Sequence, residues 1–203
     1  MAHAIHDLTE YAITPVTASE SGLPDAGLLL DQLATEERHR QLEAILWKLR
    51  QMPEVRDCGP VLPLTRHRSS LVRHEAITVL GQCSDPRAEE ALLGVLADPH
   101  DDYDRISANA ALGQCGSRAA IPALAAQIHD RVDDVKCSAI YALMELGDSS
   151  LVPVFLDALS DRSSTAKWYA MHAIERHGNQ LTIRPVCAAH LPALLHGFLM
   201  FIS

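Results

Sequence analysis

The fold is decided by the stretch Val72-Arg-His-Glu-Ala-Ile-Thr-Val-Leu-Gly-Gln-Cys-Ser-Asp-Pro-Arg-Ala-Glu-Glu-Ala-Leu-Leu93, whose pattern occurs four times. The other copies start at Asp104, Val135 and Ala166, at offsets of 32, 31 and 31 residues, and align without a gap. A fainter copy begins near Gln41, with Ala44 expected in the alanine column. A period of about 31 residues indicates a solenoid of stacked units, each too small to bury an apolar face alone. Four columns keep one kind of residue: basic (Arg73, Arg105, Lys136, Lys167), alanine (Ala76, Ala108, Ala139, Ala170), aliphatic (Leu80, Leu112, Leu143, Ile174) and turn-forming (Ser84, Gly116, Gly147, Gly178).

Each unit is predicted to be a pair of helices. In the second helix the apolar positions follow the spacing i, i+3, i+4 and i+7, as between Ala76 and Cys83, which is typical of one buried stripe. The turn-forming residue is expected to end this helix in a left-handed conformation. The Asp, Ser or Asn that follows is expected to cap the next helix. Alanine in the column at Ala76 lets neighbouring pairs stack closely, because a methyl group is all that fits between two backbones.

The repeats resemble HEAT repeats, in the short form found in phycobilin lyases and deoxyhypusine hydroxylase. The residues that carry the resemblance are Ala91-Leu-Leu-Gly-Val-Leu-Ala-Asp98 and Asp130-Arg-Val-Asp-Asp-Val-Lys-Cys-Ser-Ala139. The resemblance implies an all-α, right-handed α-solenoid (an alpha-alpha superhelix) that binds proteins. It also implies a ladder between adjacent repeats, made by a turn Asp and a basic residue six positions later, as in Asp130 with Lys136. Asp98 with Arg105 is one residue longer.

Three segments are expected from these patterns. Residues 1–35 form an N-terminal capping segment, because a polar stretch bracketed by proline precedes the first helical pattern. Residues 36–190 form the solenoid, with about five helix pairs. Residues 191–203 form an apolar C-terminal segment, either a terminal capping helix or a surface that docks on a partner.

Composition excludes several classes of protein. The net charge is −9 and no dense Lys/Arg run occurs, which argues against a nucleic-acid partner. No apolar run reaches the roughly 18 residues of a membrane span. Five cysteines without a CxxC pair favour a reducing compartment, so we expect a cytoplasmic protein.

Catalytic and metal motifs are absent or incomplete. The sequence lacks GxSxG, GxxxxGK[ST] and HExxH, so we expect no enzyme activity. His74-Glu75 resembles one of the four dyads that hold two irons in deoxyhypusine hydroxylase. The equivalent pairs are Ile106-Ser107, Cys137-Ser138 and Trp168-Tyr169, and one dyad supplies too few ligands. We therefore predict neither a metal site nor a cofactor.

Two surfaces are predicted to bind a partner. The first is a stripe along the second helices, polar at one end and aromatic at the other. Its residues are His74, Glu75, Thr78, Ser107, Ser138, Tyr141, Trp168, Tyr169 and His172. In phycobilin lyases the concave face holds a tetrapyrrole, so a chromophore or iron on this face stays open as the alternative.

The second surface is a ridge of carboxylates in the recurring turns. Its residues are Asp98, Asp101, Asp102, Asp133 and Asp134. Such a ridge would attract a basic partner at long range. Some of these carboxylates could instead cap the second helices, as we expect of Asp104 and Asp134. The favoured interpretation is a non-catalytic scaffold or adaptor for a partner protein with a basic surface, in a narrower version an inhibitor or immunity factor.

Overall fold

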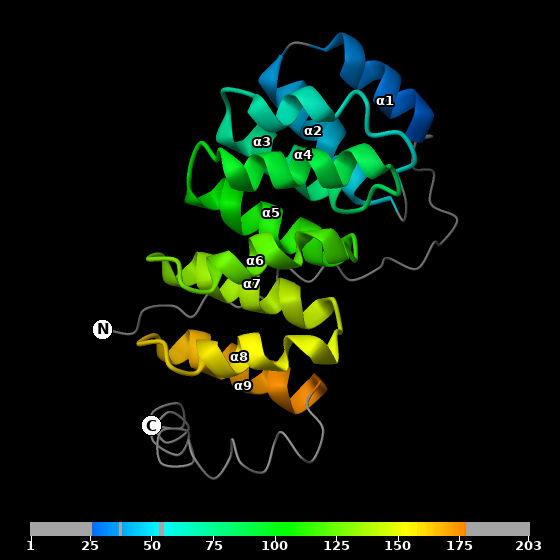
Figure 1. The fold of residues 1–203 in the computed structure, drawn as a ribbon. Coiled ribbons are helices and arrows are strands. Elements are labelled where there is room, and N and C mark those ends of the chain that lie inside the picture. The colour runs from blue at the N-terminus through cyan, green and yellow to red at the C-terminus, as the bar shows by residue number, and fades with distance from the viewer. Residues whose placement is uncertain (1–25, 37, 53–54, 178–203) are drawn as a thin grey trace.

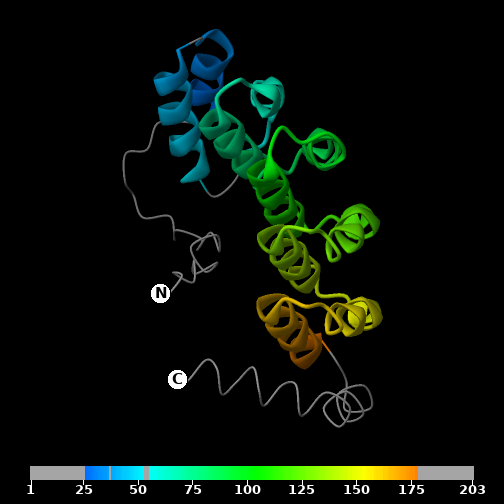
Figure 2. The ribbon, with the colours of Figure 1, turned by 90° about the vertical axis from the view of Figure 1, so that its left-hand side faces the viewer.

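Two rows of helices stack along one axis in the computed structural model, which describes residues 26–36, 38–52 and 55–177 (Figure 1). In chain order the elements are α1 (Ala26–Thr35), α2 (His39–Arg50), the 3₁₀ helix η2 (Leu62–Arg66), α3 (Ser70–Leu80), α4 (Pro86–Ala97), α5 (Asp102–Gln114), η3 (Arg118–Ala120), α6 (Ile121–Gln127), α7 (Asp133–Glu145), η4 (Ser149–Leu151), α8 (Val152–Ala158) and α9 (Ser164–His177). Helices α2, α3, α5, α7 and α9 are the second helices of the pairs, and the last four form the inner row of a curved stack (Figure 2). The all-α solenoid predicted from the repeats is confirmed.

The first helix of each pair differs in length from unit to unit. In the second unit it is reduced to the five-residue 3₁₀ helix η2. In the last two units a 3₁₀ turn precedes a seven-residue α-helix, with Pro122 or Pro153 in its first turn, where a missing N–H costs little. The second helices are longer and more regular.

The turn chemistry agrees with the sequence at most positions. The side chains of Asp85, Ser117 and Asp148 accept hydrogen bonds from backbone N–H groups at the start of the next helix. Gly116 and Gly147 have φ of 69° and 66°, the left-handed conformation expected after a second helix.

Ser84 does not share this left-handed conformation, because within the described part of the chain only glycines have positive φ. Here α3 ends at Leu80, with Gly81 still right-handed. The chain then runs through a single bridge between Val55 and Cys83, which ties it to the segment before η2.

The core lies between the two rows of helices. All four members of the alanine column are fully buried, as is the aliphatic column from Leu80 to Leu143. Two glycines, one just after α3 and one in α5, lie against the backbone of the next second helix. A Cβ added to Gly81 would lie 2.9 Å from Cα of Ala111, and one added to Gly113 would lie 2.8 Å from Cα of Ala142. Glycine is therefore required at both positions for α3, α5 and α7 to stack.

The faint first copy has a different register from the one expected. Ala44 was expected in the alanine column, but it is exposed in α2. Ile45 is buried in its place, and Leu49 is fully buried where the next units have Leu80. The offset to the next unit is thus 31 residues, which the more divergent sequence of α2 concealed.

The N-terminal helix α1 packs on α2 through Leu29, Leu30 and Leu33. The boundary between a capping segment and the solenoid at residue 36 stays a prediction. The predicted apolar segment 191–203 lies outside the described residues, as do Gly178 and the first 25 residues.

Candidate functional site

The inner face is the surface of the second helices that carries the predicted stripe. Its positions repeat along each helix at intervals of three or four residues, starting at Leu71 in α3 and Tyr103 in α5. Residues of this face come from every second helix, so the stacking of units places side chains that are far apart in sequence next to one another.

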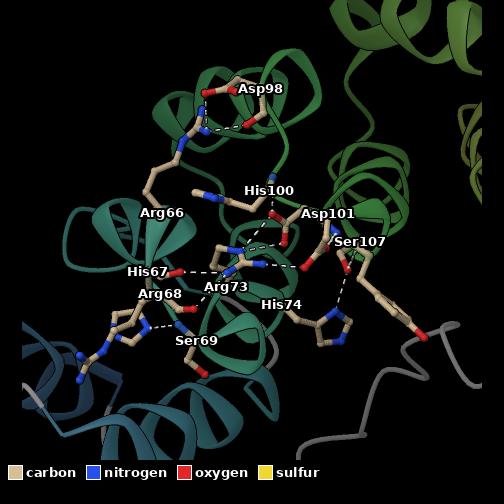
Figure 3. A network of polar contacts seen from close by, with 12 residues as sticks. Arg66, His67, Arg68, Ser69, Arg73, His74, Asp98, His100, Asp101 and Ser107 are labelled. Atoms are coloured by element: carbon tan, nitrogen blue, oxygen red, sulfur yellow. Dashed lines mark hydrogen bonds and ion pairs between the residues drawn. The ribbon is translucent and has the colours of Figure 1, made fainter.

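At the α3–α5 junction the inner face carries a buried polar contact. Nδ1 of His74 lies 2.6 Å from Oγ of Ser107, and that hydroxyl donates to the carbonyl of Tyr103 at 2.7 Å (Figure 3). Because a carbonyl only accepts, His74 is the donor to Ser107 and carries its proton on Nδ1. Burial lowers the pKa of His74, which keeps the ring neutral.

This Ser–His pair is not arranged as a nucleophile. Ser107 is buried, and its hydroxyl proton is directed to a backbone carbonyl. A serine nucleophile needs an exposed oxygen whose proton is aimed at the base. The contact therefore joins α3 to α5.

Glu75, the second member of the predicted dyad, is held by Arg50 of α2. Oε1 of Glu75 accepts from the guanidinium of Arg50 at 3.3 Å, and Gln82 donates to the carbonyl of the same arginine at 3.0 Å. No group of three or more His, Cys, Asp or Glu side chains arranged to hold a metal ion occurs in the described part of the chain. The side chains of His74 and Glu75 thus make contacts between helices, and Thr78 donates to the backbone of its own helix.

The contact between α5 and α7 contains a buried amide that the sequence analysis did not single out. Nδ2 of Asn109 donates to Oγ of Ser138 at 3.0 Å, linking α5 to α7, and Ser138 donates to the carbonyl of Val135. The repeat alignment could have identified Asn109, because it is a polar residue in a column that holds Ile77 and Ile140 in neighbouring units.

The C-terminal end of the inner face gathers the predicted aromatic side chains. Tyr141 of α7 meets Tyr169 of α9 edge to face, with ring centroids 6.4 Å apart. Trp168 lies across Tyr169 at 5.0 Å and stacks on His172 at 5.6 Å with an interplanar angle of 14°. We call these four residues the aromatic patch. Their proximity follows from the repeat alignment, which puts Tyr141 and His172 in one column.

Three more large apolar side chains are exposed on the second helices. Trp47 of α2 is 55% exposed, Leu71 of α3 is 61% exposed and Tyr103 of α5 is 67% exposed, and Trp168 in the patch is 45% exposed. With the corrected register, Trp47 belongs to the column of Tyr141 and His172. The sequence analysis missed Trp47, Leu71 and Tyr103 because a periodic pattern predicts which face is buried and leaves open how far a large side chain on the other face protrudes.

The predicted ridge carboxylates form the rungs of an ion-pair ladder between repeats. The buried Arg73 donates through Nε to both oxygens of Asp104, at 3.1 and 3.0 Å, and through a terminal nitrogen to Asp101 at 2.7 Å (Figure 3). In the next units Arg105 binds Asp102 and Asp130.

The last described rung joins Lys136 to Asp161 at 2.8 Å and to Asp133 at 2.9 Å. The hydrogen bonds from Asp161 and Asp133 raise the pKa of Lys136. The ladder implied by the HEAT resemblance is therefore present, and it joins the basic residue of one unit to the turn carboxylate of the next.

Two details of the ladder differ from the expectation. Asp98, the expected ladder residue of this turn, binds Arg66 at 3.0 Å. Because the turn is one residue longer, Asp101 and Asp104 bind Arg73 in its place. Asp101, and not Asp104, caps α5, since its side chain accepts from the backbone N–H of Asp104. Asp134 lies inside the first turn of α7 and makes no capping hydrogen bond.

The ladder contains more carboxylates than cations. Each of the three cations is shared by two carboxylates, and Asp134 is exposed with no ion pair among the residues that the structure covers. The three ladder cations thus face six carboxylates, while the exposed Arg131 and Arg162 lie in the same turns.

A family model for HEAT repeats matches the chain twice, over residues 26–113 and 60–144, which together span more than half of its length. The chain belongs to the HEAT-repeat family. The first match starts with α1, so the family pattern reaches into the segment that we predicted to be a cap. No curated protein matches the sequence.

Among solved structures, this HEAT-repeat chain is similar to a designed armadillo repeat protein. The TM-score is 0.55, the identity is 16%, and the match covers 81% of this chain and 88% of the other. At this identity the likeness shows the fold alone. HEAT and armadillo repeats build scaffolds that are typically non-enzymatic and often mediate protein interactions.

The described cysteines of the HEAT-repeat chain are free. Burial raises the pKa of Cys58 and Cys115 to about 11, and that of Cys83 and Cys137 to about 12. At neutral pH these thiols are protonated and poor nucleophiles. Among the described helices, none combines the length and the apolar character that crossing a membrane requires.

Proposed function

We propose that this HEAT-repeat chain is a non-catalytic scaffold that binds a partner protein through its inner face, with the acidic turn edge assisting. The observation that carries the proposal is the exposure of large apolar side chains on second helices from α2 to α9. These side chains share the face of the second helices in a fold that buries most of its other large apolar side chains, which supports an interaction surface there. Aromatic residues in particular supply binding energy when an interface closes over them.

The acidic edge supports a basic surface on the partner. The excess of carboxylates in the ladder would act over about 8 Å at physiological salt, so it would speed encounter more than it would tighten the complex. A chain that covers a basic partner in this way could serve as an adaptor, or as an inhibitor or immunity factor. The free cysteines support action in a reducing compartment such as the cytoplasm.

The alternative, a chromophore or iron on the inner face, has less support. Nδ1 of His74 and Oε1 of Glu75 are engaged by Ser107 and Arg50, although Oε2 of Glu75 is buried without a hydrogen-bond partner among the described residues. Elemental analysis and an absorption spectrum of the purified protein test this directly. Stoichiometric iron or a pigment that co-purifies would favour the alternative over the scaffold.

The role of the acidic edge is tested by neutralising its exposed carboxylates. The variant Asp102→Asn, Asp133→Asn, Asp134→Asn is compared with the wild type in pull-downs from an extract of the producing cells. A retained protein should bind the variant more slowly, and its association with the wild type should slow as salt increases. No retained protein at all, or association that neither salt nor the variant changes, would contradict the proposal.

A further inference from the structure

We propose that His39 and His67 form a pH-sensitive joint, which holds the start of α2 against the turn before α3 when both rings are neutral and releases it when they are protonated. The inference goes beyond the proposed function, because it concerns how the N-terminal helices are attached and needs no partner. Three observations support it: the hydrogen bonds of the two rings, their place at the starts of helices and the charges around them.

Each ring uses one nitrogen to accept a hydrogen bond from the turn before α3. Nε2 of His39 accepts from the guanidinium of Arg68, at 3.1 Å from Nε and 2.7 Å from a terminal nitrogen. Nδ1 of His67 accepts from the backbone N–H of Ser69 at 3.1 Å (Figure 3). A protonated imidazole has donors only, so protonation of either ring replaces its hydrogen bond with a contact between two donors.

The charged form of His39 would have no acceptor in the described part of the chain. Its Nδ1 is buried and makes no hydrogen bond to a described residue. Because Nε2 faces Arg68, which only donates, protonation would leave both N–H groups of the ring without an acceptor. Buried donors without acceptors are costly, so protonation weakens the closed joint.

Both rings lie at the N-terminal ends of helices. His39 is the first residue of α2, whose N-cap residue makes no side-chain capping hydrogen bond, and His67 lies two residues before Ser69, the N-cap of α3. The helix macrodipole is positive at these ends, so it repels an imidazolium. The ring centroids are only 5.0 Å apart and meet edge to face, so two positive rings would also repel each other.

The charges around the pair oppose a further positive charge. Burial, followed by the charges of His39 and Arg68, lowers the pKa of His67. Within the described residues no carboxylate binds the guanidinium of Arg68, which donates to His39. Other charged side chains at the two helix starts and the turn are Glu43 (accepting from Ser69 at 3.5 Å), Arg38 (paired with Glu36), Arg66 (paired with Asp98), Arg73 (paired with Asp101 and Asp104) and Arg40.

Acid should therefore favour the open joint. A released histidine has a pKa near 6.5, so the open form binds protons that the closed form does not, and opening becomes easier as the pH falls below about 6.5. At pH 5.5 each such proton raises the open population about tenfold. Because Trp47 lies about two turns after His39 in α2, opening loosens the N-terminal end of the inner face.

The test is amide hydrogen exchange of the full chain at pH 7.5 and 5.5, corrected for the intrinsic pH dependence of exchange. Protection of the α2 amides should fall about tenfold relative to those of α7. His39→Gln and His67→Asn place a carbonyl oxygen near the positions of Nε2 and Nδ1 but cannot take up a proton, so the double variant should abolish this fall. Circular dichroism at pH 7.5 checks that the variants fold, and each single variant should remove part of the fall.

His172→Gln is the matched control, because it removes a half-exposed histidine of α9 and should leave the fall at α2 unchanged. Equal loss of protection in α2 and α7, or a fall that the folded variants of His39 and His67 retain, would overturn the inference. Either result would leave the scaffold function standing, since neither measurement involves a partner.

Discussion

Arg73 of α3 and Asp104 of α5 form a buried ion pair between repeats, with their side chains 6% and 2% exposed. The remaining donors of Arg73 reach Asp101 and the carbonyl of His67, and Asp104 also accepts from the backbone N–H of His100. A buried pair is tolerated when hydrogen bonds satisfy both ions in this way. Removing one partner leaves the other as an uncompensated buried charge.

We therefore expect Asp104→Asn to lower the free energy of unfolding by about 3 kcal/mol, because Arg73 would stay buried with half of its charge pairing lost. Urea denaturation followed by circular dichroism measures this. The matched control is Arg87→Ala, which removes an exposed pair with Asp57 and Asp85 and should lower the free energy of unfolding far less. Similar losses in both variants would show that burial does not set the strength of the ladder.

The close packing of second helices gives a second prediction with a built-in comparison. Gly113→Ala places a Cβ 2.8 Å from the backbone of Ala142, so α5 and α7 must separate, and stability should fall by about 1–3 kcal/mol. In Gly94→Ala the added Cβ in α4 meets no atom within 4 Å. This variant should therefore raise the free energy of unfolding by about 0.5–1 kcal/mol through helix propensity.

Thermal unfolding of the two glycine variants should thus give shifts of opposite sign. A stabilising effect of Gly113→Ala would contradict the close packing of α5 on α7, because the added methyl group would then fit without moving the helices.

Two histidines have lowered pKa values in the folded state, so we predict that acid destabilises the fold. Burial lowers the pKa of His67 and of His74, so both are neutral in the folded state at pH values where the unfolded chain, with a pKa near 6.5, already binds a proton. The unfolded state then binds more protons, and stability falls as the pH drops below about 6.5. Protonation would also break the hydrogen bond that Nδ1 of His67 accepts from the N–H of Ser69.

Urea midpoints between pH 7.5 and 5 measure this dependence. His74→Gln, which cannot take up a proton, should flatten the slope in this window, whatever it does to stability at pH 7.5. If His74→Gln leaves the pH dependence of the urea midpoint unchanged, His74 has the same pKa in the folded and unfolded states, which would contradict this account.

The repeat period, the helix pairs, the alanine column and the caps at Asp85, Ser117 and Asp148 were all predictable, because each depends on local sequence and on a pattern repeated four times. The register of α2 and the 3₁₀ helix η2 were not, since their sequences diverge from that pattern and tertiary packing decides them. The sequence predicted that a ladder of Asp and basic residues joins the repeats. It did not predict the carboxylates that bind Arg73, because the turn is one residue longer and Asp98 binds Arg66 instead.

For the site, the alignment predicted that Tyr141, Trp168, Tyr169 and His172 would lie together, which the ring contacts confirm. It could not predict that Ser107 and His74 contact each other through Nδ1, since a column alignment contains no rotamers. That the inner face and the turn edge bind a partner stays a proposal.

The most direct test of the scaffold proposal is the retention of a partner by inner-face variants. Proteins bound from an extract of the producing cells are quantified for the wild type, for Trp47→Ser, Tyr103→Ser, Trp168→Ser combined, and for the control Leu28→Ser. Leu28 is 52% exposed but belongs to α1, outside the inner face. We predict that a protein retained by the wild type and the control is lost from the triple variant by about tenfold or more. Equal retention by the triple variant, or no protein retained by the wild type, would contradict the claim.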